Sequence, residues 1–179
     1  MSSTVSQETL DLLNAVSFAA RAHRHQLRKD GQTPYASHPF RVCLIVRHVF
    51  GIDDPKVLTA ALLHDTIEDT TTDFDDLAEQ FSPEVARWAA DLSKDKRLPD
   101  DEREQAYMQR LVAAECRVKI CKLADVFDNL LDSAHFPPDK RRKTIERARS
   151  YLSALGLHLP EMARRPFEIV SRLLAENDQ

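Results

Sequence analysis

The chain has 179 residues, of which three are glycine, 42% are hydrophobic and 30% are charged, with a formal net charge of −4. Ordinary glycine usage would give about four times as many glycines. Because Gly31, Gly51 and Gly156 are far apart, the sequence excludes a glycine-rich phosphate-binding loop. The negative net charge argues against a nucleic-acid partner, since such proteins are usually basic.

Neither a membrane partner nor a secretory signal is expected. The sequence has no apolar run of about 18 residues, and its N-terminal segment lacks a basic region followed by an apolar one. Cys43, Cys116 and Cys121 show no Cys-x-x-Cys spacing. We therefore expect reduced thiols in a cytoplasmic protein, rather than disulfides or a structural zinc site. The sequence does not define the oligomeric state.

Helix start signals mark the first third of the chain. Thr4 and Gln7 form a candidate capping box for a long first helix. A second helix begins near Ser37 and ends at Gly51, and a third follows Asp54 over residues 56–69. The expected apolar stripe of the first helix consists of Leu10, Leu13, Val16, Ala20 and His23.

The remaining elements are predicted to be helical as well. The same signals place helices over residues 73–81, 84–93, 101–114, 116–133 and 139–156, and a last one from Pro160. The prediction is an all-α fold, a single helical bundle of about nine helices. One domain spans residues 1–179, with a core at about 8–156 and a C-terminal helix at 157–176.

Ionisable residues interrupt the apolar face of the third predicted helix. His64 follows the apolar residues of that helix at helical spacing and therefore points inward. Glu68 lies one turn after His64, and Asp69 one turn after Asp65. Buried charges are costly unless they are paired or bind a metal. The cluster predicts either a metal site or a core histidine with acidic groups at a helix end.

Asp125 and Asn129 share the apolar stripe of the helix at 116–133. An inward aspartate there either completes the site around His64 or forms a salt bridge with an arginine.

His38 stands at a predicted helix start, after the cations Arg28 and Lys29, where an anion is favoured. A capping or surface role is the alternative for this histidine. Together the candidate ligands offer imidazoles and carboxylates, a set that suits Mn, Fe, Co or Zn. They are His38, His64, Asp65 and Asp125.

An adjacent His and Asp on one helix, joined by a distant His and a distant Asp, resembles the pattern of the HD metal-dependent phosphohydrolases. Three segments resemble more closely the hydrolase domain of the RelA/SpoT alarmone enzymes, and above all the free-standing, metazoan-type small alarmone hydrolases. The segments are FAARAHRHQLRKDGQTPYASHPFRV, AALLHDTIEDTTTDFDDLAEQF and VKICKLADVFDNL. The resemblance runs from about Phe18 to Leu131 and more weakly to Tyr151. It implies a metal-dependent 3′-pyrophosphohydrolase that converts ppGpp or pppGpp to GDP or GTP and pyrophosphate.

The same resemblance implies roles for individual residues. It implies Mn²⁺ as the cofactor, held by His38, His64, Asp65 and Asp125. Glu68 and Asp69 would handle the hydrolytic water. The implied contacts to the phosphorylated guanine nucleotide are Arg28, Lys29, Asn129, Arg103 and Tyr151.

One segment departs from the family pattern. Val126 follows Asp125 where a basic residue is expected, and Asp128 makes that helix still less basic, which would alter the nucleotide pocket. Two alternatives stay open. One is an HD phosphohydrolase acting on another phosphorylated nucleotide such as NADPH, which free-standing hydrolases of this type also dephosphorylate. The other is a non-catalytic nucleotide-binding regulatory module.

Overall fold

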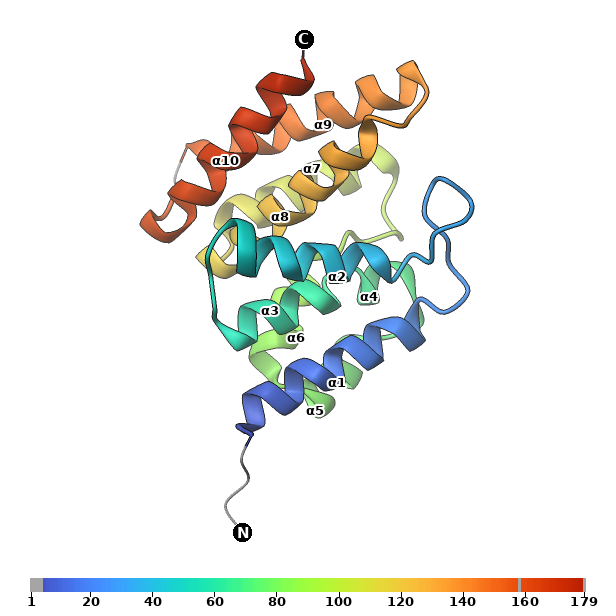
Figure 1. Ribbon diagram of the computed structural model, residues 1–179, viewed down its shortest axis with the longest axis vertical. Helices are drawn as coiled ribbons and strands as arrows, with labels where there is room; N and C mark the ends of the chain where they lie inside the picture. Colours follow the sequence, from blue (N-terminus) through green and yellow to red (C-terminus); the bar gives the residue numbers. More distant parts are fainter. Residues whose placement is uncertain (1–4, 158, 179) are drawn as a thin grey trace.

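The computed structural model describes residues 5–157 and 159–178, most of which are helical (Figure 1). A π-helical segment at Ile45–Val49 continues the second helix. Within the described residues, extended pairing is limited to an isolated bridge between Leu27 and Pro34. The predicted all-α fold is confirmed. The helices are α1 (Gln7–Ala22), α2 (Ser37–Leu44), α3 (Pro55–Leu63), α4 (Thr66–Asp69), α5 (Phe74–Gln80), α6 (Pro83–Leu92), α7 (Asp100–Ala113), α8 (Cys116–Ser133), α9 (Pro138–Gly156) and α10 (Glu161–Asn177).

Helix α8 forms the centre of the bundle and packs against α2, α3, α6, α9 and α10 (Figure 1). Its residues Ile120, Leu123 and Ala124 are fully buried. Helix α10, the predicted C-terminal helix, lies on α8 and α9 and buries Ala163 and Val170. The last helix therefore adds to the same apolar core as the rest of the chain.

The stripe predicted for the first helix is wrong at Leu10, Leu13 and Val16, whereas its last member, His23, is buried as expected. Leu10, Leu13 and Val16 are exposed, whereas the fully buried residues of this helix are Ala15 and Ala19. Helix α1 packs against α3, and small side chains at such a contact let two helices approach closely. The pattern of large apolar residues therefore pointed to the wrong face.

Helix ends follow the expected capping chemistry with one change. Thr4, the predicted cap of α1, lies outside the described residues, and the side chain of Ser6 accepts a hydrogen bond from the Thr9 N–H. Asp54 caps α3 through its side chain, as its sequence position indicates. Gly51 ends the second helical stretch with φ of +76°, in the left-handed region that favours glycine.

The helix predicted over residues 56–69 is broken between α3 and α4. At the break, His64 Nδ1 donates to the carbonyl of Ala61 over 2.8 Å. The hydroxyl of Thr66 donates to the carbonyl of Leu63 over 2.7 Å. Side chains that bond to nearby carbonyls compete with the regular helical ladder. The break places the adjacent His64 and Asp65 at the junction of the two helices.

Among the described residues, no helix has both the length and the apolar character required to cross a bilayer. The cysteines are free thiols, with Cys121 buried and both Cys43 and Cys116 half-buried.

Candidate active site

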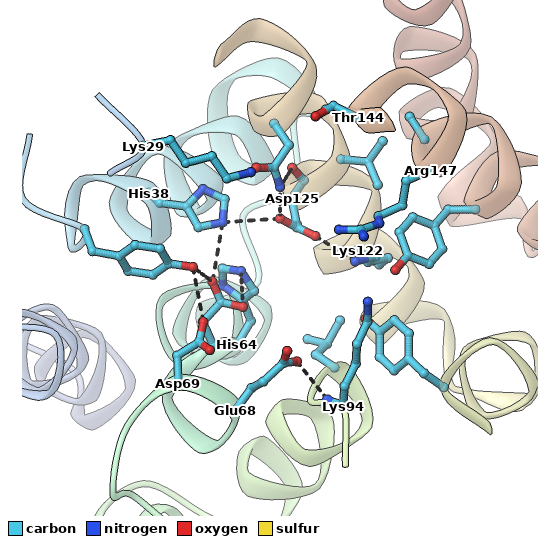
Figure 2. A pocket seen from close by; sticks show the side chains of 18 of the residues that line it. Lys29, His38, His64, Glu68, Asp69, Lys94, Lys122, Asp125, Thr144 and Arg147 are labelled. Carbon is cyan, nitrogen blue, oxygen red and sulfur yellow. Dashed lines mark hydrogen bonds and ion pairs between the residues drawn. The ribbon is translucent and has the colours of Figure 1, made fainter. Parts of the chain in front are cut away.

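A cavity of about 210 Å³ brings together residues from α2, α4, α8 and α9 and from the loops that follow α1 and α6 (Figure 2). Imidazoles and carboxylates form one part of its wall: His38, His64, Asp65, Glu68, Asp69 and Asp125. The cations Lys94, Lys122 and Arg147 lie across the cavity from the two imidazoles (Figure 2). The cavity therefore has a side suited to cations and a side suited to anions.

The first cluster in this wall consists of His38, His64 and Asp65, whose ligand atoms all lie within 4.8 Å of one another. His64 Nε2 is 3.1 Å from Asp65 Oδ1, and His38 Nε2 is 3.5 Å from Asp65 Oδ2. His64 Nδ1 donates to a backbone carbonyl, so Nε2 carries the lone pair of the neutral ring, and this buried atom has no hydrogen-bond partner. An orphaned nitrogen beside a carboxylate fits a metal-binding site.

Asp125 lies next to this cluster, with Oδ1 3.2 Å from His38 Nε2. Lys122 Nζ donates to Asp125 Oδ2 over 2.8 Å, and Asn129 Nδ2 donates to Asp125 Oδ1 over 2.5 Å. Burial alone would raise the pKa of Asp125, but the Lys122 ammonium and the His38 hydrogen bond hold it well below its usual range. Asp125 is therefore a charged, fixed oxygen donor beside His38.

The short helix α4 carries Glu68 and Asp69 to the same cavity. Glu68 Oε2 accepts a hydrogen bond from the Lys94 N–H over 2.8 Å. Burial raises the pKa of Glu68 above its ordinary value. Asp69 Oδ1 pairs with Lys96 Nζ at 2.6 Å. Both carboxylates are thus tied to the loop that follows α6.

Four of the five predicted nucleotide contacts line the cavity: Arg28, Lys29, Asn129 and Tyr151. Arg103 does not line it, because its guanidinium pairs with Asp100 on the surface of α7 at 2.5 Å.

Sequence reasoning missed several residues of the cavity. Tyr35 Oη donates to Asp65 Oδ2 over 2.6 Å. Lys122 Nζ lies 4.1 Å from the ring centre of Tyr151. Tyr35 and Lys122 both lie inside the segments that carry the family resemblance, so their position in the sequence could have identified them as candidate site residues. Lys94 and Arg147 carry no comparable signal, since each is one cation among many in a polar stretch.

The chain is similar to known proteins in both sequence and fold. The family model of the HD domain matches residues 15–152. Human guanosine-3′,5′-bis(diphosphate) 3′-pyrophosphohydrolase MESH1 is 43% identical over 133 residues, which is 74% of each chain. The protein of that name from Drosophila melanogaster is 40% identical over 121 residues, 67% of this chain and 68% of the relative.

Similarity extends to bacterial proteins and to solved structures. The bifunctional (p)ppGpp synthase/hydrolase SpoT of Escherichia coli K12 is 32% identical over 157 residues, covering 82% of this chain and 22% of the relative. The structure of a metazoan ortholog of SpoT that hydrolyses ppGpp and plays a role in starvation responses superimposes with a TM-score of 0.84. It is 28% identical and covers 98% of both chains.

Proposed function

The chain belongs to the HD domain family, and we propose that it is a metal-dependent hydrolase that removes pyrophosphate from the 3′ position of ppGpp or pppGpp. The products are GDP or GTP and pyrophosphate. One observation carries the proposal: a single cavity sets an imidazole–carboxylate cluster opposite the cations Lys94, Lys122 and Arg147. Such a cavity suits a metal ion next to a polyphosphate. The names of the relatives support the choice of substrate.

We propose Mn²⁺ as the cofactor, held by His38, His64, Asp65 and Asp125. The orphaned Nε2 of His64 and the neighbouring carboxylate oxygens supply the mixed nitrogen and oxygen donors that such an ion accepts. A bound divalent ion lowers the pKa of its water and offsets phosphate charge.

Glu68 and Asp69 are proposed to orient the hydrolytic water. Glu68 presents a carboxylate whose pKa is raised by burial, and a raised pKa makes it a better proton acceptor near neutral pH. Its bond to the Lys94 N–H fixes one oxygen. Glu68 would take the proton of the water, while Asp69 would hold the water in place.

The cationic residues are proposed to bind the phosphates. Lys29, Lys94, Lys122 and Arg147 reach the cavity from separate elements, so they surround an anion rather than flank it on one side. Ammonium and guanidinium groups form the stronger, charge-assisted hydrogen bonds with phosphate oxygens. Their arrangement would hold the pyrophosphate as its bond to the 3′ oxygen breaks.

The test is a product assay on the purified chain, first stripped of metal with a chelator and then supplied with Mn²⁺. We expect pyrophosphate release from ppGpp with Mn²⁺ and none without it. A parallel reaction with NADPH is assayed for orthophosphate. Absence of pyrophosphate from a protein that binds Mn²⁺ by calorimetry would contradict the proposal. Release of orthophosphate from NADPH, with no release of pyrophosphate from ppGpp, would favour a phosphohydrolase that acts on another nucleotide.

A further inference from the structure

Asp128 is a carboxylate on α8 that is fully buried and does not line the cavity. From the sequence it was expected to alter the nucleotide pocket. The structure places its contacts on α2 and on Arg28 in the loop that follows α1. His38 Nδ1 lies 2.7 Å from Asp128 Oδ2, and Arg41 Nε donates to Asp128 Oδ1 over 2.5 Å. The carboxylate therefore contacts Nδ1 of His38, while Nε2 of the same ring faces the cavity.

Two arginines compensate the buried charge of Asp128. Arg41 bonds to one of its oxygens, and Arg28 Nη2 lies 3.4 Å from the other. The same arginines also reach Asp132, one turn further along α8. A buried carboxylate is tolerated when its oxygens accept charged hydrogen bonds of this kind. Asp128 is thus held by Arg41 at Oδ1 and by both Arg28 and His38 at Oδ2.

The contact decides which nitrogen of His38 is available to the cavity. In the neutral imidazole that a metal ion would bind, Nδ1–H donates to the carboxylate and Nε2 carries the lone pair. His38 Nε2 is the atom 3.2 Å from Asp125 Oδ1 and 3.5 Å from Asp65 Oδ2. His64 receives the corresponding support from a neutral group, the carbonyl of Ala61. The two imidazoles are oriented in the same sense, but only His38 is backed by a negative charge.

We propose that Asp128 is a positioning residue for metal binding: it fixes the orientation and tautomer of His38 and strengthens Nε2 as a donor. The proposal rests on the metal site of the proposed function. Carboxylates that hold a ligating histidine in this way typically contribute 10–100-fold to metal affinity or activity, as an order of magnitude.

The experiment compares Asp128→Asn with Asp132→Asn. Both substitutions remove one negative charge from the same arginine cluster, but Asp132 bonds to Arg28, whereas Asp128 also bonds to His38. Mn²⁺ affinity is measured by isothermal titration calorimetry on the metal-free full chain. We expect Asp128→Asn to weaken Mn²⁺ binding by roughly 10–100-fold and Asp132→Asn to change it by less than about threefold.

Unchanged Mn²⁺ affinity in Asp128→Asn would overturn the proposal, even if the melting temperature falls, because the residue would then be structural only. An equal loss in Asp132→Asn would overturn it too, since general charge in the cluster would explain the effect. If Asp128→Asn does not fold, the double variant Asp128→Asn/Arg41→Gln restores the charge balance. Its reference is Arg41→Gln alone, and the double variant should bind Mn²⁺ more weakly.

The calorimetric readout also separates this proposal from the proposed function. A wild-type chain that binds Mn²⁺ and loses affinity on Asp128→Asn supports the role of Asp128 whether or not ppGpp is hydrolysed. A wild-type chain that does not bind Mn²⁺ or another divalent ion would overturn both the metal site and the role of Asp128.

Discussion

The backbone N–H of Lys94 donates to Glu68 Oε2 over 2.8 Å, so the loop after α6 holds one oxygen of a carboxylate that α4 carries to the cavity. The two residues are far apart in the chain and come from separate elements. The contact fixes the side chain of Glu68 without using a second side chain. A glutamine at this position could accept the same hydrogen bond, which allows the charge to be removed while the geometry is kept.

Glu68→Gln should therefore retain Mn²⁺ binding and lose turnover. We expect kcat to fall by roughly 10²–10⁴-fold, the usual contribution of a general base. Steady-state kinetics and calorimetric Mn²⁺ titration measure the two effects. The matched control is Glu79→Gln on the exposed side of α5, which should behave as wild type. Wild-type turnover in Glu68→Gln would remove this residue from the chemistry.

Asp65→Asn should abolish both metal binding and hydrolysis. The carboxylate lies close to both imidazoles, 3.1 Å from His64 and 3.5 Å from His38. The amide oxygen of an asparagine is uncharged and is therefore a weaker metal ligand. The loss of Mn²⁺ affinity should exceed the roughly 100-fold that removal of an outer partner can cause. Asp11→Asn on α1 serves as the control. Full metal-dependent turnover in Asp65→Asn would contradict the assigned ligand set.

Arg147→Gln should weaken the use of substrate, whereas Arg103→Gln should not. Arg147 lines the cavity, but Arg103 pairs with Asp100 away from it. Loss of a hydrogen bond to a charged group costs about 1.5–3 kcal/mol, which corresponds to a fall in kcat/KM of roughly 10–150-fold. A larger loss of kcat/KM in Arg103→Gln than in Arg147→Gln would support the nucleotide contact that the family resemblance implied for Arg103.

The stability of the fold should depend on pH through His23. This side chain is 1% exposed, and burial lowers its pKa from 6.5 although the hydrogen bond with Gln26 opposes the shift. Below pH 6.5 the unfolded chain binds a proton at this position more readily than the folded chain does. The contribution of His23 therefore destabilises the folded state as the pH falls through this window.

Urea unfolding at pH 7 and at pH 5, in wild type and in His23→Phe, measures that contribution. The wild type should lose more free energy of unfolding between the two pH values than the variant does, because phenylalanine takes up no proton. An equal or smaller loss in the wild type would show that His23 is not held neutral by burial.

Helix starts were predictable because their chemistry is local. Asp54 caps α3 as expected, and Pro83 begins α6 after Ser82. The inward position of His64 also followed from its spacing along an apolar helix. Spacing alone could not predict that His64 and the distant Asp125 lie in the same site. Periodicity indicates which face of a helix is buried, but not which other element packs against that face.

Other features depend on tertiary packing and could not be read from the pattern. Leu10 and Leu13 are large and apolar yet exposed, because α1 packs on α3 through its small alanines. Apolar residues are common on protein surfaces, so their presence alone does not define the inner face. Arg147 was missed for the opposite reason: one cation on a polar helix resembles an ordinary surface residue until the fold turns it toward the cavity.

Asp125 lies in the middle of α8, between the fully buried residues Leu123 and Leu130. The proposed ligand would be displaced from that position only when the central helix itself moves, not when a peripheral loop opens. Turnover should therefore report on the integrity of the whole bundle. An activity screen of randomly mutated chains would select for packing in the core as strictly as for chemistry, and an inactive clone would not by itself identify a residue of the site.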